Sequence, residues 1–214
     1  MTQIKATYLG HFGEDKDVAE AARVSFAKKA ENYTEEANNK LIKFLAREGH
    51  IAPFGHCYAK FHIKAPVFVA RQLVKHKFMR MSEVSRRYVK DRPEFYYPSV
   101  WRAAAADVKQ GSVGVAASQY FPTSYLKQTE DETVQRYEKM INQGICAEQA
   151  RMILPVNMFT EWVWSGSLDA FSSMCNLRCK PDTQYETRLV ADQISEKMHE
   201  LFPVSWAALM VCRS

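Results

Sequence analysis

The sequence has no apolar run approaching the roughly 18 residues that a membrane-spanning helix needs. Its first ten residues, MTQIKATYLG, also lack the apolar centre of a secretory signal peptide. Cysteines are few and odd in number, five in 214 residues, and they do not follow the spacing of a disulfide framework. We therefore expect a protein of the reducing cytoplasm that does not bind a membrane.

Motifs for metals and for the common nucleotide-binding folds are missing too. There is no C-x-x-C or H-E-x-x-H pair, and Cys175 and Cys179 lie four residues apart on a predicted helix, so we expect no metal site. There is no G-x-G-x-x-G or P-loop pattern, because the nearest match, GSVG at 111–114, lacks the lysine and the strand–helix setting. A dinucleotide would have to bind at a site of another kind.

The composition is that of an ordinary globular chain. Hydrophobic residues make up 47% and charged residues 25%, and no repeat, low-complexity tract or long linker interrupts residues 1–214, which predicts a single domain. The 29 basic and 24 acidic residues give a net charge of only +5. Proteins that bind nucleic acid usually concentrate more positive charge than this, so a nucleic-acid partner is not expected.

The pattern of apolar residues predicts an α+β fold, dominated by helices, with a small and mostly antiparallel sheet. Residues 57–65, CYAKFHIKA, alternate between apolar and polar positions as a half-buried strand does. Residues 103–120, rich in small side chains, are predicted to be an insert. Helices are predicted at 16–30, at 35–47 with Thr34 as N-cap, after Pro66, at 131–143 before Gly144, and at 146–153, 157–165, 167–177 and 182–201 with Asp182 as N-cap.

Positive charge gathers in one stretch, RQLVKHKFMRMSEVSRRYV at 71–89. Its arginines offer forked donors that suit a phosphate or a carbonyl-rich ring, although a solvated helix end or a nucleic-acid groove would also explain it. Further along, Arg151 and Arg178 lie among apolar residues, where a buried arginine needs an anionic or hydrogen-bonding partner. If Arg87, Arg151 and Arg178 converge, they would form a compact pocket for a phosphate and a ring.

Several segments match one enzyme family in the same order along the chain. They are AARVSF at 21–26, GHIAPFGH at 49–56, FHIKAPVFVARQ at 61–72, KHKFMRMSEVSRRY at 75–88, EFYYPS at 94–99, ARMILPVNMFTEWVW at 150–164 and NLR at 176–178. Over most of its length the sequence resembles the flavin-dependent thymidylate synthase (ThyX) family. The family hallmark is Arg-His-Arg, seven residues and then Ser. Here Lys75-His76-Lys77 precede Ser85 at the same spacing, with lysine in place of both arginines.

The resemblance implies the ThyX fold, a homotetramer with active sites shared between subunits, and reductive methylation of dUMP to dTMP. Methylenetetrahydrofolate would supply the carbon, and FAD and NADPH the reducing equivalents. It implies catalytic roles for Arg178, which would polarise the pyrimidine, for Ser85 in positioning, and for His50, which would line the folate and nicotinamide face. The implied dUMP site consists of Gln72, Glu83, Ser85, Arg87, Arg151 and Arg178.

The resemblance assigns FAD to a less typical set of residues. These are Lys75, His76, Lys77, Ser167 and Ser173. Where this chain has Ala52 and Gly55, family members usually carry Thr and Glu. Where it has Ser167, Asp169 and Ser173, they carry Asn, Arg and Asn, and in place of Asp182 they carry His. The dUMP half of the site is thus kept and the flavin half is altered, which predicts weak, salt-sensitive binding of FAD.

Two other functions fit the altered flavin half. In a folate-dependent pyrimidine nucleotide 5-hydroxymethylase, water would capture the methylene adduct in place of hydride. A non-catalytic relative that binds a nucleotide or RNA would use the same basic cluster, and its binding to RNA would weaken steeply with salt.

Overall fold

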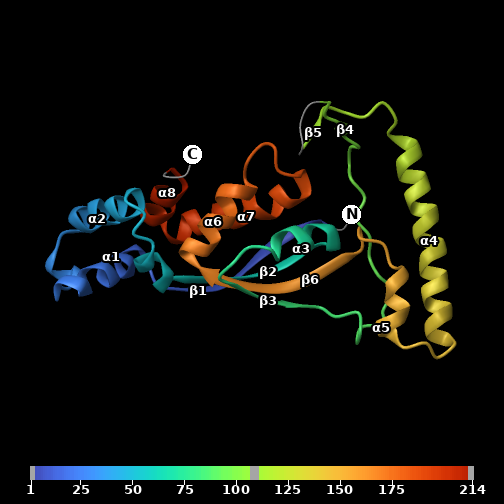
Figure 1. The fold of residues 1–214 in the computed structure, drawn as a ribbon, viewed down its shortest axis with the longest axis horizontal. Coiled ribbons are helices and arrows are strands. Elements are labelled where there is room, and N and C mark those ends of the chain that lie inside the picture. Colours follow the sequence, from blue (N-terminus) through green and yellow to red (C-terminus); the bar gives the residue numbers. More distant parts are fainter. Residues whose placement is uncertain (1–2, 107–110, 212–214) are drawn as a thin grey trace.

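The computed structural model describes residues 3–106 and 111–211, which form an antiparallel sheet with helices packed on it (Figure 1). The main sheet has the order β1-β2-β6-β3, and β4 and β5 form a separate pair. The strands are β1 (Lys5–Phe12), β2 (Tyr58–Pro66), β3 (Met79–Glu83), β4 (Ala103–Ala104), β5 (Ser112–Val113) and β6 (Phe159–Ser167). The α-helices are α1 (Asp15–Arg23), α2 (Glu35–Arg47), α3 (Val67–Leu73), α4 (Tyr120–Asn142), α5 (Ala147–Ala150), α6 (Leu168–Arg178), α7 (Tyr185–Leu201) and α8 (Pro203–Val211). The predicted α+β class is confirmed.

The strand predicted from alternation at residues 57–65 is confirmed as β2. Ala59, Phe61 and Ile63 are buried on the face that α3, α6 and α7 cover, and the polar positions between them face the other way. On that opposite face Tyr58 and Lys60 are exposed. The sheet therefore has one face in the core and one open face, the arrangement that an alternating sequence favours.

The helix predicted at residues 157–165 is wrong, because these residues enter the central strand β6. This strand pairs antiparallel with β2 on one side and with β3 on the other. Trp162 and Trp164 are buried, and the Trp164 ring packs edge-on against Phe171 with centroids 5.6 Å apart. A short run of buried aromatic residues cannot be assigned to helix or strand by periodicity alone. Here the pairing of this segment with both neighbouring strands makes it a strand.

Helix α2 has the predicted boundaries. Thr34 is its N-cap, and its hydroxyl accepts a hydrogen bond from the backbone N–H of Ala37 at 3.2 Å. The helix predicted at 16–30 is shorter, since α1 ends at Arg23 and the 3-10 turns η1 (Val24–Phe26) and η2 (Ala30–Asn32) follow it. Local capping thus defines the start of α2 well, while nothing in the sequence marks the early end of α1.

Two other helices differ from their predicted starts. Helix α7 has Gln184 and not Asp182 as its N-cap. Helix α4 begins at Tyr120, eleven residues before the predicted start, because Pro122 lies in its first turn, where proline needs no hydrogen-bond partner. The predicted C-terminal glycine of α4 is confirmed, since Gly144 adopts a φ of +84°.

The insert predicted at 103–120 contains the β4–β5 pair, and residues 107–110 lie outside the described part of the chain. It leads into α4, which stands as an arm at one end of the molecule beside α5 (Figure 1). The short turn η3 (Ala52–His56) precedes β2, and the short turn η4 (Arg151–Ile153) follows α5. Within the described residues, no helix combines the length and apolarity needed to cross a membrane.

Candidate active site

The first group of predicted site residues lies on the helical side of the sheet. Arg178 is the last residue of α6, and its Nε donates to His76 Nε2 at 3.1 Å. Its Nη2 donates to the backbone carbonyl of Gln72 in α3 at 3.5 Å. The structure thus brings together Gln72 and Arg178, predicted for the nucleotide, and His76, predicted for the flavin.

His76 is held in its neutral form by this contact. Burial and the charge of Arg178 lower the pKa of His76 to about 4. Because Nε2 accepts from a guanidinium, the ring proton lies on Nδ1. Burial also lowers the pKa of Arg178. At neutral pH His76 therefore fixes the direction of the Arg178 guanidinium and adds no positive charge of its own.

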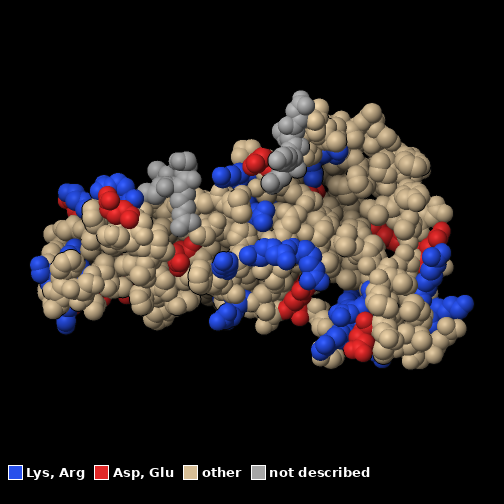
Figure 2. Space-filling model, in the orientation of Figure 1, with Lys and Arg blue, Asp and Glu red and all other residues tan. Residues whose placement is uncertain are grey.

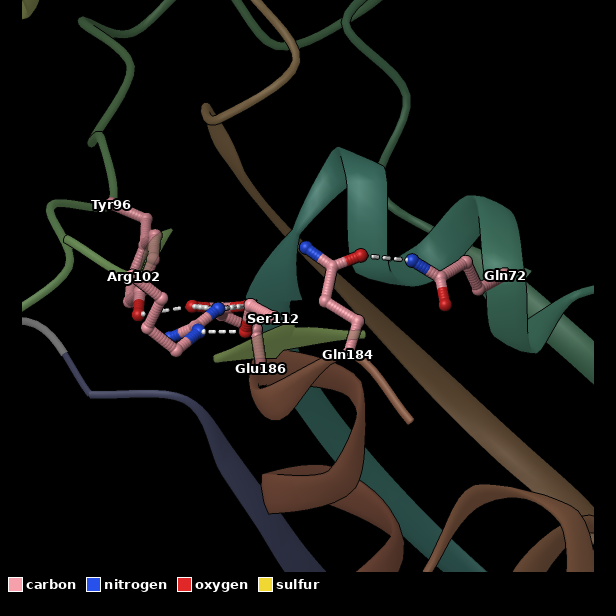
Figure 3. Close-up of polar contacts among 6 residues, drawn as sticks. All are labelled: Gln72, Tyr96, Arg102, Ser112, Gln184 and Glu186. Carbon is pink, nitrogen blue, oxygen red and sulfur yellow. Dashed lines mark hydrogen bonds and ion pairs between the residues drawn. The ribbon is translucent and has the colours of Figure 1, made fainter. Parts of the chain in front are cut away.

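The Gln72 side chain is held by residues that the sequence did not reveal (Figure 3). Gln72 Nε2 donates to Oε1 of Gln184, the N-cap of α7. Two residues on, both carboxylate oxygens of Glu186 accept from Arg102 Nη2 at 2.9 Å, and one accepts from the Tyr96 hydroxyl at 3.1 Å. Gln184, Glu186, Arg102 and Tyr96 line a cavity of about 430 Å³. No motif marks these residues, since they come from the start of α7 and from the segment between β3 and β4, which only the fold brings together.

The second group of predicted residues begins where β3 ends. Glu83 is the last residue of β3, and one of its carboxylate oxygens accepts from the Thr160 hydroxyl of β6 at 2.8 Å. Two residues further on, Ser85 Oγ accepts from the backbone N–H of Arg87 at 3.3 Å. Glu83 is therefore oriented by the sheet itself, and Ser85 by the turn that follows it.

Arg87 and Arg151 both lie near Glu148 of α5. Arg151 Nε donates to the Glu148 carbonyl at 3.3 Å. The pKa of Arg87 is raised by its hydrogen bond to the Tyr88 hydroxyl and, further away, by the Glu148 carboxylate. Both arginines are exposed, so Arg151 is not buried among its apolar neighbours in the sequence. An anion can reach both side chains without opening the core.

The two groups occupy different parts of the chain. In Figure 1, α3 and α6 lie over the sheet, whereas the segment after β3 leaves the edge of the sheet and runs toward α5, which stands beside α4 at one end of the molecule. Across the described residues, no hydrogen bond or ion pair joins the group of Arg178 to the group of Arg87 and Arg151. The three arginines therefore do not converge in one pocket of a single chain.

Most residues predicted for the flavin line two neighbouring cavities. A cavity of about 330 Å³ is lined by His76, Lys77 and Ser173, together with Ile51, Phe78, Asp169 and Ala170. A cavity of about 520 Å³ shares Phe78 and Asp169 with it, and adds Gly55, Tyr58, Arg80, Ser165, Gly166 and Ser167. The structure therefore brings four of the five predicted residues together. Lys75 is exposed and lines neither cavity.

Asp169 and Ser167 are joined at the start of α6. Ser167 is its N-cap, and Ser167 Oγ donates to Asp169 Oδ1 at 2.5 Å. An acidic side chain in the first turn of a helix is favoured by the helix dipole, which explains how the chain accommodates it. His50 lies near this cleft in sequence, one residue before Ile51, and its exposed ring packs edge-on against Phe44 at 6.1 Å.

Comparisons with known proteins identify the family. The family described as "Thymidylate synthase complementing protein" matches residues 8–204. A flavin-dependent thymidylate synthase of Thermus thermophilus is 37% identical over 94% of this chain and 73% of its own, and one of Kosmotoga olearia is 34% identical over 92% and 86%. The chain belongs to the flavin-dependent thymidylate synthase family.

Solved structures agree with this assignment. The UMP/dUMP methylase PolB of Streptomyces cacaoi, bound with 5-Br dUMP, superposes with a TM-score of 0.90 at 26% identity, covering 98% of this chain and 96% of its own. The structure of the same methylase with 5-Br UMP superposes with a TM-score of 0.87 at 25% identity, covering 99% of this chain and 96% of its own. The predicted ThyX-type fold is confirmed, and the named relatives are methylating enzymes.

Positive charge is spread over the face shown in Figure 2. Lys and Arg lie over the middle of the molecule, beside α5, and at the end formed by α1 and α2, with Asp and Glu among them. Two of these three regions are near elements that carry predicted site residues.

Proposed function

We propose that this protein methylates dUMP to dTMP, with methylenetetrahydrofolate as the source of the carbon. The observation that carries the proposal is the Arg178 guanidinium, which a neutral His76 and the Gln72 carbonyl hold at the end of α6. A guanidinium held in place before the reaction suits a ring whose carbonyls gain negative charge in the transition state. The names of the relatives, and the dUMP and UMP analogues in the PolB structures, support this choice of substrate.

The second group of residues would hold the nucleotide phosphate. Arg87 and Arg151 are exposed near one another and offer the forked donors that suit a phosphate. Ser85 Oγ accepts from the backbone N–H of Arg87, which fits a positioning role and not a nucleophile, since no general base contacts it within the described residues. Glu83, held by Thr160, would orient the sugar or the ring.

A second copy of the chain would complete the site. One chain keeps the group of Arg178 apart from the group of Arg87 and Arg151, so a single nucleotide that touches both must lie between chains. We therefore retain the homotetramer with shared active sites as part of the proposal. Closed symmetric assemblies are the usual way in which identical chains share a site.

The cleft beside His76 fits a flavin nucleotide. Its two cavities, about 330 and 520 Å³, lie within the usual range for ligand sites and combine cations with exposed aromatic rings. Lys77 would add positive charge that attracts the anionic dinucleotide, and Ser173 lies in the same cavity. FAD bound there would supply the hydride, NADPH would reduce the flavin again, and His50 would line the face for folate and nicotinamide.

Calorimetry on the full-length protein tests the nucleotide site. We expect dUMP to bind better than dTMP or uridine, and Arg87→Ala and Arg151→Ala each to weaken dUMP binding about tenfold or more, since each removes a charge-assisted contact. UMP belongs in the comparison because PolB is named for both nucleotides. Arg136→Ala is the matched control, since Arg136 is an exposed arginine paired with Glu132 on α4. Unchanged dUMP binding in both site variants would refute the assignment.

Asp169 favours a second candidate, the 5-hydroxymethylase. It places a negative charge in both cavities of the flavin cleft, which would disfavour an anionic dinucleotide. The substrate and the folate would be the same, but water would add to the methylene adduct in place of hydride. Mass spectrometry of the product distinguishes dTMP from the hydroxymethyl nucleotide. RNA binding that weakens steeply with salt, without turnover, would favour the non-catalytic reading.

A further inference from the structure

Phe78 has an unusual backbone and an unusual environment. Its φ is +62°, in the left-handed region that bulky residues rarely adopt, and its side chain is 82% exposed. It lies between Lys77 and β3, and its ring lines both cavities of the flavin cleft. Strained residues of this kind are frequent where a ligand is held. Here the strained backbone directs an aromatic ring into the cleft and away from the core.

The two ends of the cleft differ chemically. The smaller cavity contains His76, which contacts Arg178, so it is the end nearest the proposed pyrimidine. The larger cavity contains Arg80 and Ser165, so the part of it away from His76 offers a cation and a hydroxyl group. Phe78 lines both cavities and therefore marks their junction. A ligand with a flat ring at one end and an anion at the other matches this order.

Arg80 is placed by the sheet. In the antiparallel register Arg80 of β3 lies opposite Ser165 of β6, so both side chains are on the open face. Ser165 in turn lies opposite Lys60 of β2, which adds a second cation to the same cross-strand row. Arg80 makes no hydrogen bond or ion pair with any other described residue, so its guanidinium is available to a ligand.

We propose that Arg80 binds the diphosphate of the flavin nucleotide in this chain, and that the Phe78 ring supports the flavin ring system. This inference rests on the proposed function, because it assumes that a flavin binds in the cleft. Lys75 and Lys77 stand where the family hallmark has arginines, and a lysine is a point charge without a fork. Arg80 restores a forked donor that suits a diphosphate, three residues further along the chain than Lys77.

Asp169 is the main opposing charge in the cleft. Its Oδ1 accepts from Ser167, and it lies in the first turn of α6, so part of its charge is already compensated. It lines both cavities and therefore lies near their junction with Phe78, whereas Arg80 and Ser165 line only the larger cavity. The diphosphate would lie on the Arg80 side of the junction.

The test compares FAD with lumiflavin, which has the flavin ring but no phosphate. Both are titrated into the full-length protein and followed by visible absorbance. Arg80→Ala should weaken FAD about tenfold or more and leave lumiflavin binding unchanged, because only the diphosphate contact is lost. Arg80→Lys should bind FAD with an affinity between those of the wild type and Arg80→Ala. Arg136→Ala on α4 is the control. Phe78→Gly should weaken both ligands, while its backbone tolerates the same φ. Thermal melting checks that each variant is folded.

The outcomes separate the inference from the proposed function. If the wild-type protein binds neither FAD nor lumiflavin, the flavin part of the proposed function fails and the inference fails with it. Equal FAD binding by wild type and Arg80→Ala refutes the inference alone. A parallel loss of FAD and lumiflavin in Arg80→Ala refutes the diphosphate assignment. Loss of FAD alone in that variant, with the loss of both ligands in Phe78→Gly, supports it.

Discussion

Replacing Arg102 by alanine should destabilise the folded protein by about 3 to 5 kcal/mol, because it leaves a buried carboxylate without its cation. Glu186 is only 2% exposed, and both of its oxygens accept from Arg102 Nη2 at 2.9 Å. The Tyr96 hydroxyl would remain as a donor at 3.1 Å. Burial and this carboxylate raise the pKa of Tyr96, so its hydroxyl stays protonated and can donate, but it supplies no positive charge.

The reverse change should be milder. In Glu186→Ala the charge left behind is that of Arg102, whose side chain is 28% exposed and can turn toward water. We therefore expect a loss of about 1 to 3 kcal/mol, typical of a broken hydrogen bond to a charged group. The difference between the two variants follows from the burial of the partners, since the same ion pair is lost in both.

Urea denaturation of the full-length protein measures both losses. Arg92→Ala is the control, because Arg92 pairs with Asp131 at 3.5 Å with both side chains well exposed, and such a pair contributes only about 0 to 1 kcal/mol. The slope of the free energy of unfolding against urea should be unchanged, so that midpoints can be compared. If Arg102→Ala costs no more than Arg92→Ala, the burial argument is refuted.

Three further predictions concern titration, reactivity and backbone strain. As the pH falls from 6.5 toward 4, the free energy of unfolding should decrease by at most about 3 kcal/mol, since unfolded His76 binds a proton that the folded side chain, with its pKa of about 4, does not. His76→Gln should lessen this pH dependence, and parallel curves would contradict the reasoning. Brief treatment with iodoacetamide at neutral pH should alkylate exposed Cys146 well before Cys57, because burial and nearby carboxylates raise the pKa of Cys57 to about 12; mass spectrometry of the peptides shows the order. Gly13→Ala should destabilise more than Gly49→Ala in thermal melts, since both have positive φ but only the Cβ at Gly13 would lie 2.7 Å from Cys57 Sγ.

The sequence by itself determined the family and those elements that local chemistry defines. The ordered motifs from AARVSF to NLR led to the family that the comparisons confirm. Alternation in CYAKFHIKA defined β2, because a strand with one buried face requires a period of two. The hydroxyl of Thr34 and the positive φ of Gly144 mark helix ends that depend only on their nearest neighbours.

Only the tertiary structure decided the identity of β6 and the arrangement of the site. Trp162 and Trp164 would be buried equally well in a helix, and it is the pairing of β6 with β2 and β3 that makes this segment a strand. The separation of Arg178 from Arg87 and Arg151 depends on where α6, η4 and the segment after β3 lie in the fold. Gln72 contacts Gln184, and Arg102 contacts Glu186, across more than 80 residues of sequence. Phe78 faces the cleft because of its backbone angle. Such contacts carry no local signal, since they arise from long-range packing and not from the residues beside them.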